Sequence, residues 1–145
     1  MSLLLSDQIC FPLYAAARAV QQVYRPLLRT LGLTYPQYLV MLVLWETDGL
    51  SVSGIGHRLH LDSGTLTPLL KRMEAAELVD RRRSTSDERV VTVHLTDAGR
   101  HLQTDAADVP THLIGCILPH AGELDIARLK TDLERLLQVL DEADG

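Results

Sequence analysis

LDSGTLTPLLKRMEAAELVDRRRSTSDERVVTVHL, residues 61–95, is the stretch that decides the fold. Apolar residues recur at helical spacing in its first part: Leu66, Leu69, Leu70 and Met73. This spacing predicts a helix over residues 63–76 with one apolar face. Two runs rich in branched residues follow, 78–84 and 89–95, and the turn-forming residues 85–88 join them. The stretch therefore predicts a helix followed directly by a β-hairpin.

A shorter helix is expected just before this stretch. Residues 51–59 place three apolar side chains on one face, and a break at residues 60–62 separates them from the helix at 63–76. Two short helices joined by a tight turn are typical of a helix-turn-helix. With the hairpin behind them, they predict a winged helix-turn-helix, in which one helix enters the major groove of DNA and the hairpin reaches beside it.

The outward face of the helix at 63–76 is small, polar and basic. Its residues are Ser63, Thr65, Thr67, Pro68, Lys71 and Arg72. Short hydroxyl side chains let a helix backbone approach base edges and phosphates, and the two basic residues one turn later can meet the phosphodiester backbone. These residues are our candidates for the DNA contacts of the helix. The alternative is a solvated surface with no partner.

The hairpin carries four arginines: Arg81, Arg82, Arg83 and Arg89. A guanidinium group beside a narrow minor groove is attracted by its negative potential, so we take Arg89, together with Asp87, as a candidate DNA contact. If Asp87 pairs with Arg89, the acid orients the arginine and does not touch DNA. Solvated surface charge is again the alternative.

Helices are expected on both sides of this unit. The predicted ranges are 8–31, which begins regularly near Pro12 or has a distorted first turn; 35–46, capped by Thr34 and buried on most sides; 97–116, capped by Thr96 and irregular around Pro110; and 124–140. The predicted fold is mainly α with a small β wing, in one domain over 1–145. Its DNA-binding core covers about 33–96, and helices at about 7–31 and 97–143 form a dimerisation region. We expect a homodimer because no other element covers the apolar faces of both terminal helices.

Charge and hydropathy narrow the class of protein. The formal net charge of -5 argues against a nucleic-acid partner, but residues 51–100 hold eight of the 14 Lys and Arg, and residues 101–145 carry nine acids. No stretch reaches the roughly 20 apolar residues that span a bilayer. Ser6 and Asp7 interrupt the apolar start before a signal peptide develops. The sequence thus predicts a soluble, cytoplasmic protein with a locally basic middle and no membrane partner.

Four motifs carry a resemblance to a known family. DERVVTVHLTDAG at 87–99 resembles the wing of the multiple antibiotic resistance regulator (MarR) family, whose members are dimeric winged-helix regulators. LDSGTLTPLLKRME at 61–74, LTYPQYLVMLVLWE at 33–46 and ICFPLYAAARAV at 9–20 are similar to the organic hydroperoxide resistance regulator branch. The likeness extends to about residue 125. It implies a repressor of transcription that binds a pseudo-palindromic duplex and releases it when an organic hydroperoxide oxidises a cysteine.

Cys10 is the candidate sensor. It lies near the start of the first predicted helix, where unpaired backbone N–H groups and the positive end of the dipole favour the reactive thiolate. By itself, a lone cysteine on an apolar face is more often a small buried hydrophobe. The resemblance implies the redox role, because the cysteine of the CFPLYA motif is the peroxide-reactive residue of the family.

The resemblance assigns three partners to Cys10. Tyr24 and Tyr35 correspond to tyrosines that donate hydrogen bonds to the sulfur, and Cys116 resembles a resolving cysteine that closes a disulfide after oxidation. Within one helix Tyr24 lies about 21 Å from Cys10 and cannot reach its sulfur. If the first helices of two subunits run antiparallel about a twofold axis, Tyr24 can approach the Cys10 of the other chain. The alternative for both tyrosines is core packing. Whether Cys116 reaches Cys10 within or between subunits stays open.

Three other functions compete. The first is a MarR-type repressor released by a small aromatic or phenolic ligand without cysteine chemistry. The second is a thiol peroxidase, but no CxxC motif is present and the basic hairpin would be unexplained. The third is a metal sensor, which is weak because the histidines are scattered: His57, His60, His94, His101, His112 and His120. We therefore expect no enzyme activity, no cofactor and no metal.

Overall fold

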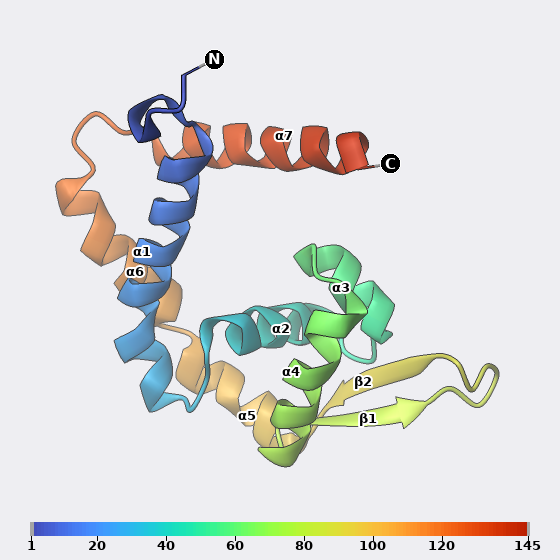
Figure 1. Ribbon diagram of the computed structural model, residues 1–145. Coiled ribbons are helices and arrows are strands. Elements are labelled where there is room, and N and C mark those ends of the chain that lie inside the picture. Colours follow the sequence, from blue (N-terminus) through green and yellow to red (C-terminus); the bar gives the residue numbers. More distant parts are fainter. Residues whose placement is uncertain (1, 145) are drawn as a thin grey trace. The chain divides into compact units, whose positions relative to one another are not determined.

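Helices make up most of residues 2–144, the part of the chain that the computed structural model describes (Figure 1). The chain divides into two units, Met1–Val109 and Pro110–Gly145. In the first unit lie η1 (Leu5–Asp7), α1 (Cys10–Thr30), α2 (Tyr35–Glu46), α3 (Val52–Leu59), α4 (Ser63–Ala75), β1 (Val79–Arg83), β2 (Val91–Leu95) and α5 (Asp97–Ala106). α6 (Val109–Ile117) begins at the boundary, and η2 (Leu118–His120) and α7 (Ile126–Asp144) complete the second unit.

The core of the first unit is built around α2, as its all-round apolar sequence predicts. Five of its residues are buried: Tyr38, Val40, Met41, Val43 and Leu44. Thr34 caps the helix, since its hydroxyl accepts from the Gln37 backbone N–H and the Gln37 side chain accepts from the Thr34 N–H. The predicted bounds and cap are both confirmed.

α3 and α4 form the predicted helix-turn-helix. Ser51 caps α3 by accepting from the Gly54 N–H at 3.0 Å, and Asp62 caps α4 by accepting from the Thr65 N–H at 2.7 Å. Between them His60 adopts φ +52°, which ends α3 and turns the chain. Gly56 is required here, because a Cβ at that position would lie 2.5 Å from the Leu61 carbonyl oxygen. The turn can therefore pack directly against α3.

The hairpin projects away from the helices of its unit, with β1 and β2 side by side (Figure 1). The strands are antiparallel, and their register runs from Val79 opposite Leu95 to Arg83 opposite Val91. On the other side of β2 the Val93 N–H donates to the Leu50 carbonyl at 2.8 Å, which ties the wing to the start of α3. Both strands are shorter than predicted. Arg89, expected to begin the second strand, lies in the turn because it and the two residues before it form a local turn of their own.

The long helix predicted over residues 97–116 is wrong, since it is two helices. Thr96 caps α5 as expected, accepting from the Gly99 N–H at 3.0 Å. α5 ends at Ala106, and α6 starts at Val109, directly before Pro110. A proline ring restricts the residue before it and offers no N–H, so the first turn of a helix accommodates it without losing a hydrogen bond. Pro26 of α1 and Pro68 of α4, by contrast, lie inside their helices.

Pro12 obeys the same rule in α1. The helix begins at Cys10, which places Pro12 in the first turn, where its missing N–H has no helical partner to lose. Of the two alternatives expected for this start, the structure shows the regular helix, which begins two residues before Pro12.

α7 begins two residues later than predicted and runs on to Asp144. Four of its leucines are exposed: Leu129, Leu133, Leu137 and Leu140. Over residues 2–144 no single helix is long and apolar enough to cross a bilayer, and α1 with α2 meet that test only as a pair bent by 71°.

Candidate nucleic-acid interface and cysteine residues

The outward face of α4 is arranged as its sequence predicts. Leu66, Leu70 and Met73 are fully buried beneath it and Leu69 nearly so. Five of the six candidate residues are exposed and Thr67 is half-buried. Neither Lys71 nor Arg72 forms an ion pair with another residue in the described range 2–144. Both cations are therefore available to an anionic partner.

A groove joins this helix to the wing. It encloses about 290 Å³ and is lined by Ser51, Val52, Ser53, Ser63, Thr67, Arg89, Val90 and Val91. Three predicted contact residues thus face one space from two elements: Ser63 and Thr67 from α4, and Arg89 from the hairpin. Hydroxyl groups beside a guanidinium offer the donors that phosphate oxygens accept.

Arg89 is exposed but held. Its side chain is 90 % exposed, and both Nε and Nη2 donate to the Asp87 carboxylate at 3.1 and 3.2 Å. The Arg89 backbone N–H donates to the same carboxylate at 3.1 Å. These bonds, those of the side chain first, lower the pKa of Asp87 below its usual value. The expected pair is present, so Asp87 orients the guanidinium towards solvent.

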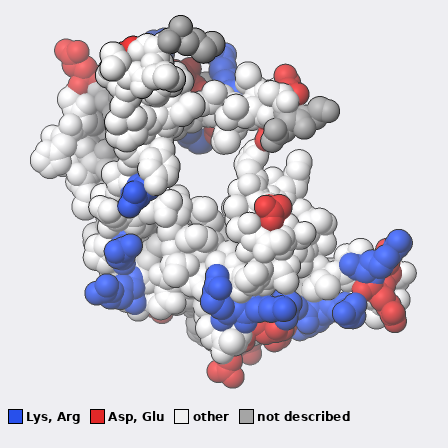
Figure 2. Space-filling view, viewed as in Figure 1, with Lys and Arg blue, Asp and Glu red and all other residues white. Residues whose placement is uncertain are grey.

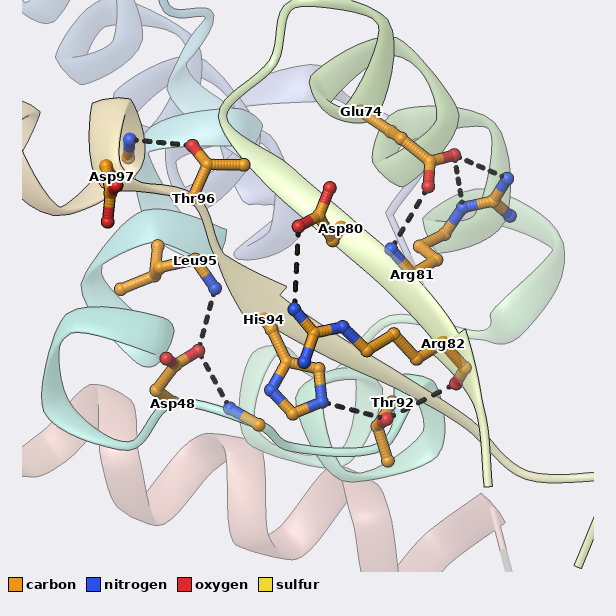
Figure 3. Close-up of polar contacts among 12 residues, drawn as sticks. Asp48, Glu74, Asp80, Arg81, Arg82, Thr92, His94, Leu95, Thr96 and Asp97 are labelled. Carbon is orange, nitrogen blue, oxygen red and sulfur yellow. Dashed lines mark hydrogen bonds and ion pairs between the residues drawn. The ribbon is translucent and has the colours of Figure 1, made fainter. Parts of the chain in front are cut away.

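The three other wing arginines also have partners, which the sequence does not reveal. Nη2 of Arg82 lies 3.6 Å from Oδ2 of Asp80, and Nη1 of Arg83 donates to the Glu88 carbonyl at 3.1 Å. Arg81 turns back towards Glu74 of α4 (Figure 3). Basic side chains gather along the edge formed by α4 and the hairpin, with acids among them at the far end of the hairpin (Figure 2).

Asp48, which follows α2, connects three parts of the first unit, and the sequence did not single it out. One carboxylate oxygen accepts from the backbone N–H groups of Gly49 and Leu95, at 2.9 and 2.8 Å (Figure 3). The other accepts from Arg100 of α5 at 2.9 Å. A single acid thus connects the loop before α3, the base of the wing and α5. The Asp-Gly pair after a helix signals a turn, but nothing in it indicates these distant partners.

Tyr24 and Tyr35 lie together. Their ring centroids are 4.9 Å apart, and Tyr38, which the sequence did not single out, lies 5.8 Å from Tyr24. Burial, and then the neighbouring phenols, raise the pKa of Tyr24 to about 12, and burial raises the pKa of Tyr35. Both phenols therefore keep their protons at neutral pH and remain donors. Neither hydroxyl donates to another residue in the described part of the chain.

Cys10 is the first residue of α1 and is exposed, so it is not a buried hydrophobe of this chain. Tyr24 follows it on the same continuous helix, which separates the two by about 21 Å at a rise of 1.5 Å per residue. The chain does not bring its own Cys10 to Tyr24. One turn after Cys10, Arg18 donates to the Tyr14 hydroxyl at 3.3 Å and lies 5.6 Å from its ring centroid.

Cys116 is an exposed free thiol in α6. Among residues 2–144 no group of three or more His, Cys, Asp or Glu side chains is arranged to hold a metal ion.

Comparison with known proteins agrees with this geometry. The transcriptional regulator SarA/Rot family matches residues 22–105. The chain is 47 % identical over 138 residues to the organic hydroperoxide resistance transcriptional regulator of Bacillus subtilis, covering 95 % of this chain and 92 % of that protein.

Two solved structures are similar over nearly the whole chain. Reduced AbfR bound to DNA is 37 % identical with a TM-score of 0.82, and 97 % of this chain and 95 % of that chain are covered. Disulfide-formed AbfR is 39 % identical with a TM-score of 0.64, and 92 % of each chain is covered. AbfR is a protein of Staphylococcus epidermidis.

Proposed function

The chain belongs to the SarA/Rot family of MarR-type transcriptional regulators, and we propose that it is a homodimeric repressor that leaves its operator when an organic hydroperoxide oxidises Cys10. The observation that carries this proposal is the division of the sensing residues along α1. Cys10 is exposed at one end, and Tyr24, about 21 Å further along the helix, offers a free donor beside that of Tyr35 on α2. Each chain therefore supplies two halves of a site that only a second copy completes.

The dimer would bring these halves together. If the α1 helices of two subunits run antiparallel about a twofold axis, Tyr24 and Tyr35 of one chain face Cys10 of the other. Apolar side chains beside the sulfur are exposed in the single chain, among them Phe11 and Tyr14, and a partner would cover them. The phenols would then donate hydrogen bonds to the thiolate and stabilise it.

The sensing reaction is a two-electron oxidation of sulfur. The Cys10 thiolate attacks the outer oxygen of the hydroperoxide, the O–O bond breaks, and the departing alkoxide takes a proton to leave as an alcohol. Cys10 becomes a sulfenic acid. The Cys116 thiol then attacks this sulfur, an S–S bond forms, and water leaves, so that Cys116 protects Cys10 from further oxidation. The peroxide acts as an effector and no turnover is required.

Oxidation releases DNA only if it favours another geometry of the dimer. The single chain matches the reduced, DNA-bound form of AbfR at a TM-score of 0.82 and the disulfide form at 0.64, so its conformation is more similar to that DNA-bound form. In the reduced state α4 would enter the major groove through its outward face, and Arg89 with Asp87 would lie beside it. We place this regulator in the cytoplasm, without a cofactor or a metal.

A non-reducing gel tests sensor, resolving residue and dimer together. After one equivalent of cumene hydroperoxide, wild type should run as a covalent dimer if the bond links subunits, and Cys10→Ser should not. Cys116→Ser should still react but stop at a sulfenic acid or a mixed disulfide, which mass spectrometry detects.

The matching DNA-binding assay separates this mechanism from a ligand-operated repressor. Wild type should lose a retarded duplex on peroxide treatment, and Cys10→Ser should retain it. Release from Cys10→Ser equal to that of wild type would refute the cysteine mechanism. A repressor that binds an aromatic ligand would then be the better explanation.

A further inference from the structure

Glu74, on the last turn of α4, holds Arg81 of β1 with one carboxylate (Figure 3). Its Oε1 accepts the Arg81 backbone N–H at 3.0 Å, and its Oε2 accepts Nε and Nη2 at 3.1 and 2.9 Å. Arg81 pairs with Val93, whose own N–H points to Leu50, so the N–H groups of this pair face away from each other. Glu74 therefore accepts the Arg81 N–H at the free edge of β1.

The backbone between α4 and β1 forms a single tight turn. Glu77 adopts φ +59°, in the left-handed region that side chains other than glycine rarely adopt. The Leu78 N–H donates to the Met73 carbonyl at 3.0 Å, which closes the end of the helix. The bond from Glu74 to Arg81 fixes the strand a second time, three residues beyond Leu78. Two fixed points determine the direction in which the hairpin leaves the helix.

We propose that Glu74 is a positioning residue for DNA recognition, which holds Arg81 so that the wing keeps a fixed angle to α4. The inference rests on the proposed function, because it assumes that α4 and the wing contact one duplex. Ser63, Thr67 and Arg89 line a common groove, so a change of this angle alters the spacing between helix and wing contacts. Contacts that are held at the correct spacing before binding lose less conformational entropy when DNA binds.

Two further observations agree with a positioning role. The Arg81 and Glu74 side chains are only 25 % and 37 % exposed, so solvent weakens this pair less than the exposed pair of Arg82 and Asp80. The hydrogen bonds from Arg81, its backbone N–H first, lower the pKa of Glu74, which keeps the carboxylate ionised. These bonds direct the Arg81 side chain to α4 of the same chain and not to the minor groove.

When Glu74 is replaced, a pure charge effect and a positioning effect predict opposite changes in DNA affinity, so the test separates them. Removing an acid from a DNA-binding unit should strengthen binding if charge alone matters. Asp80→Ala is the charge-matched control on β1, the strand that carries Arg81. It should bind DNA as tightly as wild type or more tightly. Glu74→Ala should instead bind about tenfold more weakly, as expected for losing a groove contact. The probe is the duplex that wild type selects from a random-sequence pool.

Arg81→Lys provides a variant that keeps the net charge. A lysine cannot donate from two nitrogens of one planar guanidinium to Glu74 Oε2, so Arg81→Lys should weaken binding in the same direction as Glu74→Ala. Hydroxyl-radical footprints should lose protection in the minor groove beside each half-site while major-groove protection stays. Thermal melting of each variant separates this effect from loss of folded protein.

Three outcomes would overturn the proposal. The first is that Glu74→Ala binds DNA like Asp80→Ala, and the second is that Arg81→Lys binds DNA like wild type. The third is that adding Arg81→Ala to Glu74→Ala weakens DNA binding as much as adding it to wild type does. The last would mean that Arg81 contacts DNA itself. Failure of wild type to select any sequence is a different result, because it refutes the proposed function.

Discussion

Replacing Arg72 by Ala should reduce the salt dependence of DNA binding by an amount set by the structure. Arg72 is exposed on α4, and no ion pair to another residue within 2–144 occupies it. One phosphate contact per protomer makes two per dimer. Each contact contributes about 0.9 to the slope of log K against log salt, so the slope should fall in magnitude by about 1.8. Between 50 and 200 mM salt, the variant should lose about tenfold less affinity than wild type does.

The assay is a salt titration of binding to the selected duplex by fluorescence anisotropy. Lys130→Ala is the matched control: it removes the same charge, but Lys130 is on α7 and already pairs with Glu134 at 3.4 Å. Its slope should equal that of wild type. An unchanged slope for Arg72→Ala, or an equal change in both variants, would show that Arg72 makes no phosphate contact. Because Arg72 is exposed, the melting temperature should stay the same.

Two further predictions follow from the wing and the tyrosine cluster. Arg89→Ala should weaken binding to the selected duplex more than to random duplexes, and Asp87→Ala, although it removes an acid, should act in the same direction because the guanidinium loses its support; equal affinity of either variant and wild type would contradict this. Burial raises the pKa of Tyr24 from 10.0 to about 12, so the folded state keeps a proton that the unfolded chain releases, and stability should be intact below pH 10 and fall towards pH 12. Thermal melts across this range should show a smaller loss for Tyr24→Phe, and an identical loss would mean that Tyr24 ionises normally.

The sequence predicts the DNA-binding unit well because local and global signals agree there. The α4 pattern places Leu66 and Met73 inward, and the caps at Thr34 and Thr96 are the residues that satisfy the first N–H groups. Helical periodicity, caps and turn residues act over a few positions. For this reason a single sequence is enough to locate them.

What the sequence did not predict depends on partners far along the chain. Asp48 joins Leu95 and Arg100, and Glu74 joins Arg81, only after the elements have packed. The break between α5 and α6 was expected only as an irregularity, because the tolerance of a helix for Pro110 depends on what it can pack against. The proposed sensing residues were harder still to bring together from the sequence. One chain separates Cys10 from Tyr24 along α1, and in the proposed dimer their meeting would depend on a second copy.

The placement of acids in this chain bears on its negative net charge. An overall charge of -5 argues against DNA binding only if the acids oppose the phosphates. The acids that pair with the wing arginines do not act in that way: Asp87 of the hairpin orients Arg89, and Glu74 of α4 holds Arg81. These acids cancel charge but fix direction, so the wing offers shaped contacts with little excess charge. Most of the salt dependence should then come from Lys71 and Arg72 of α4, which have no acidic partner among residues 2–144. Substitutions in the wing should therefore change sequence preference, and substitutions at the end of α4 should change the salt slope.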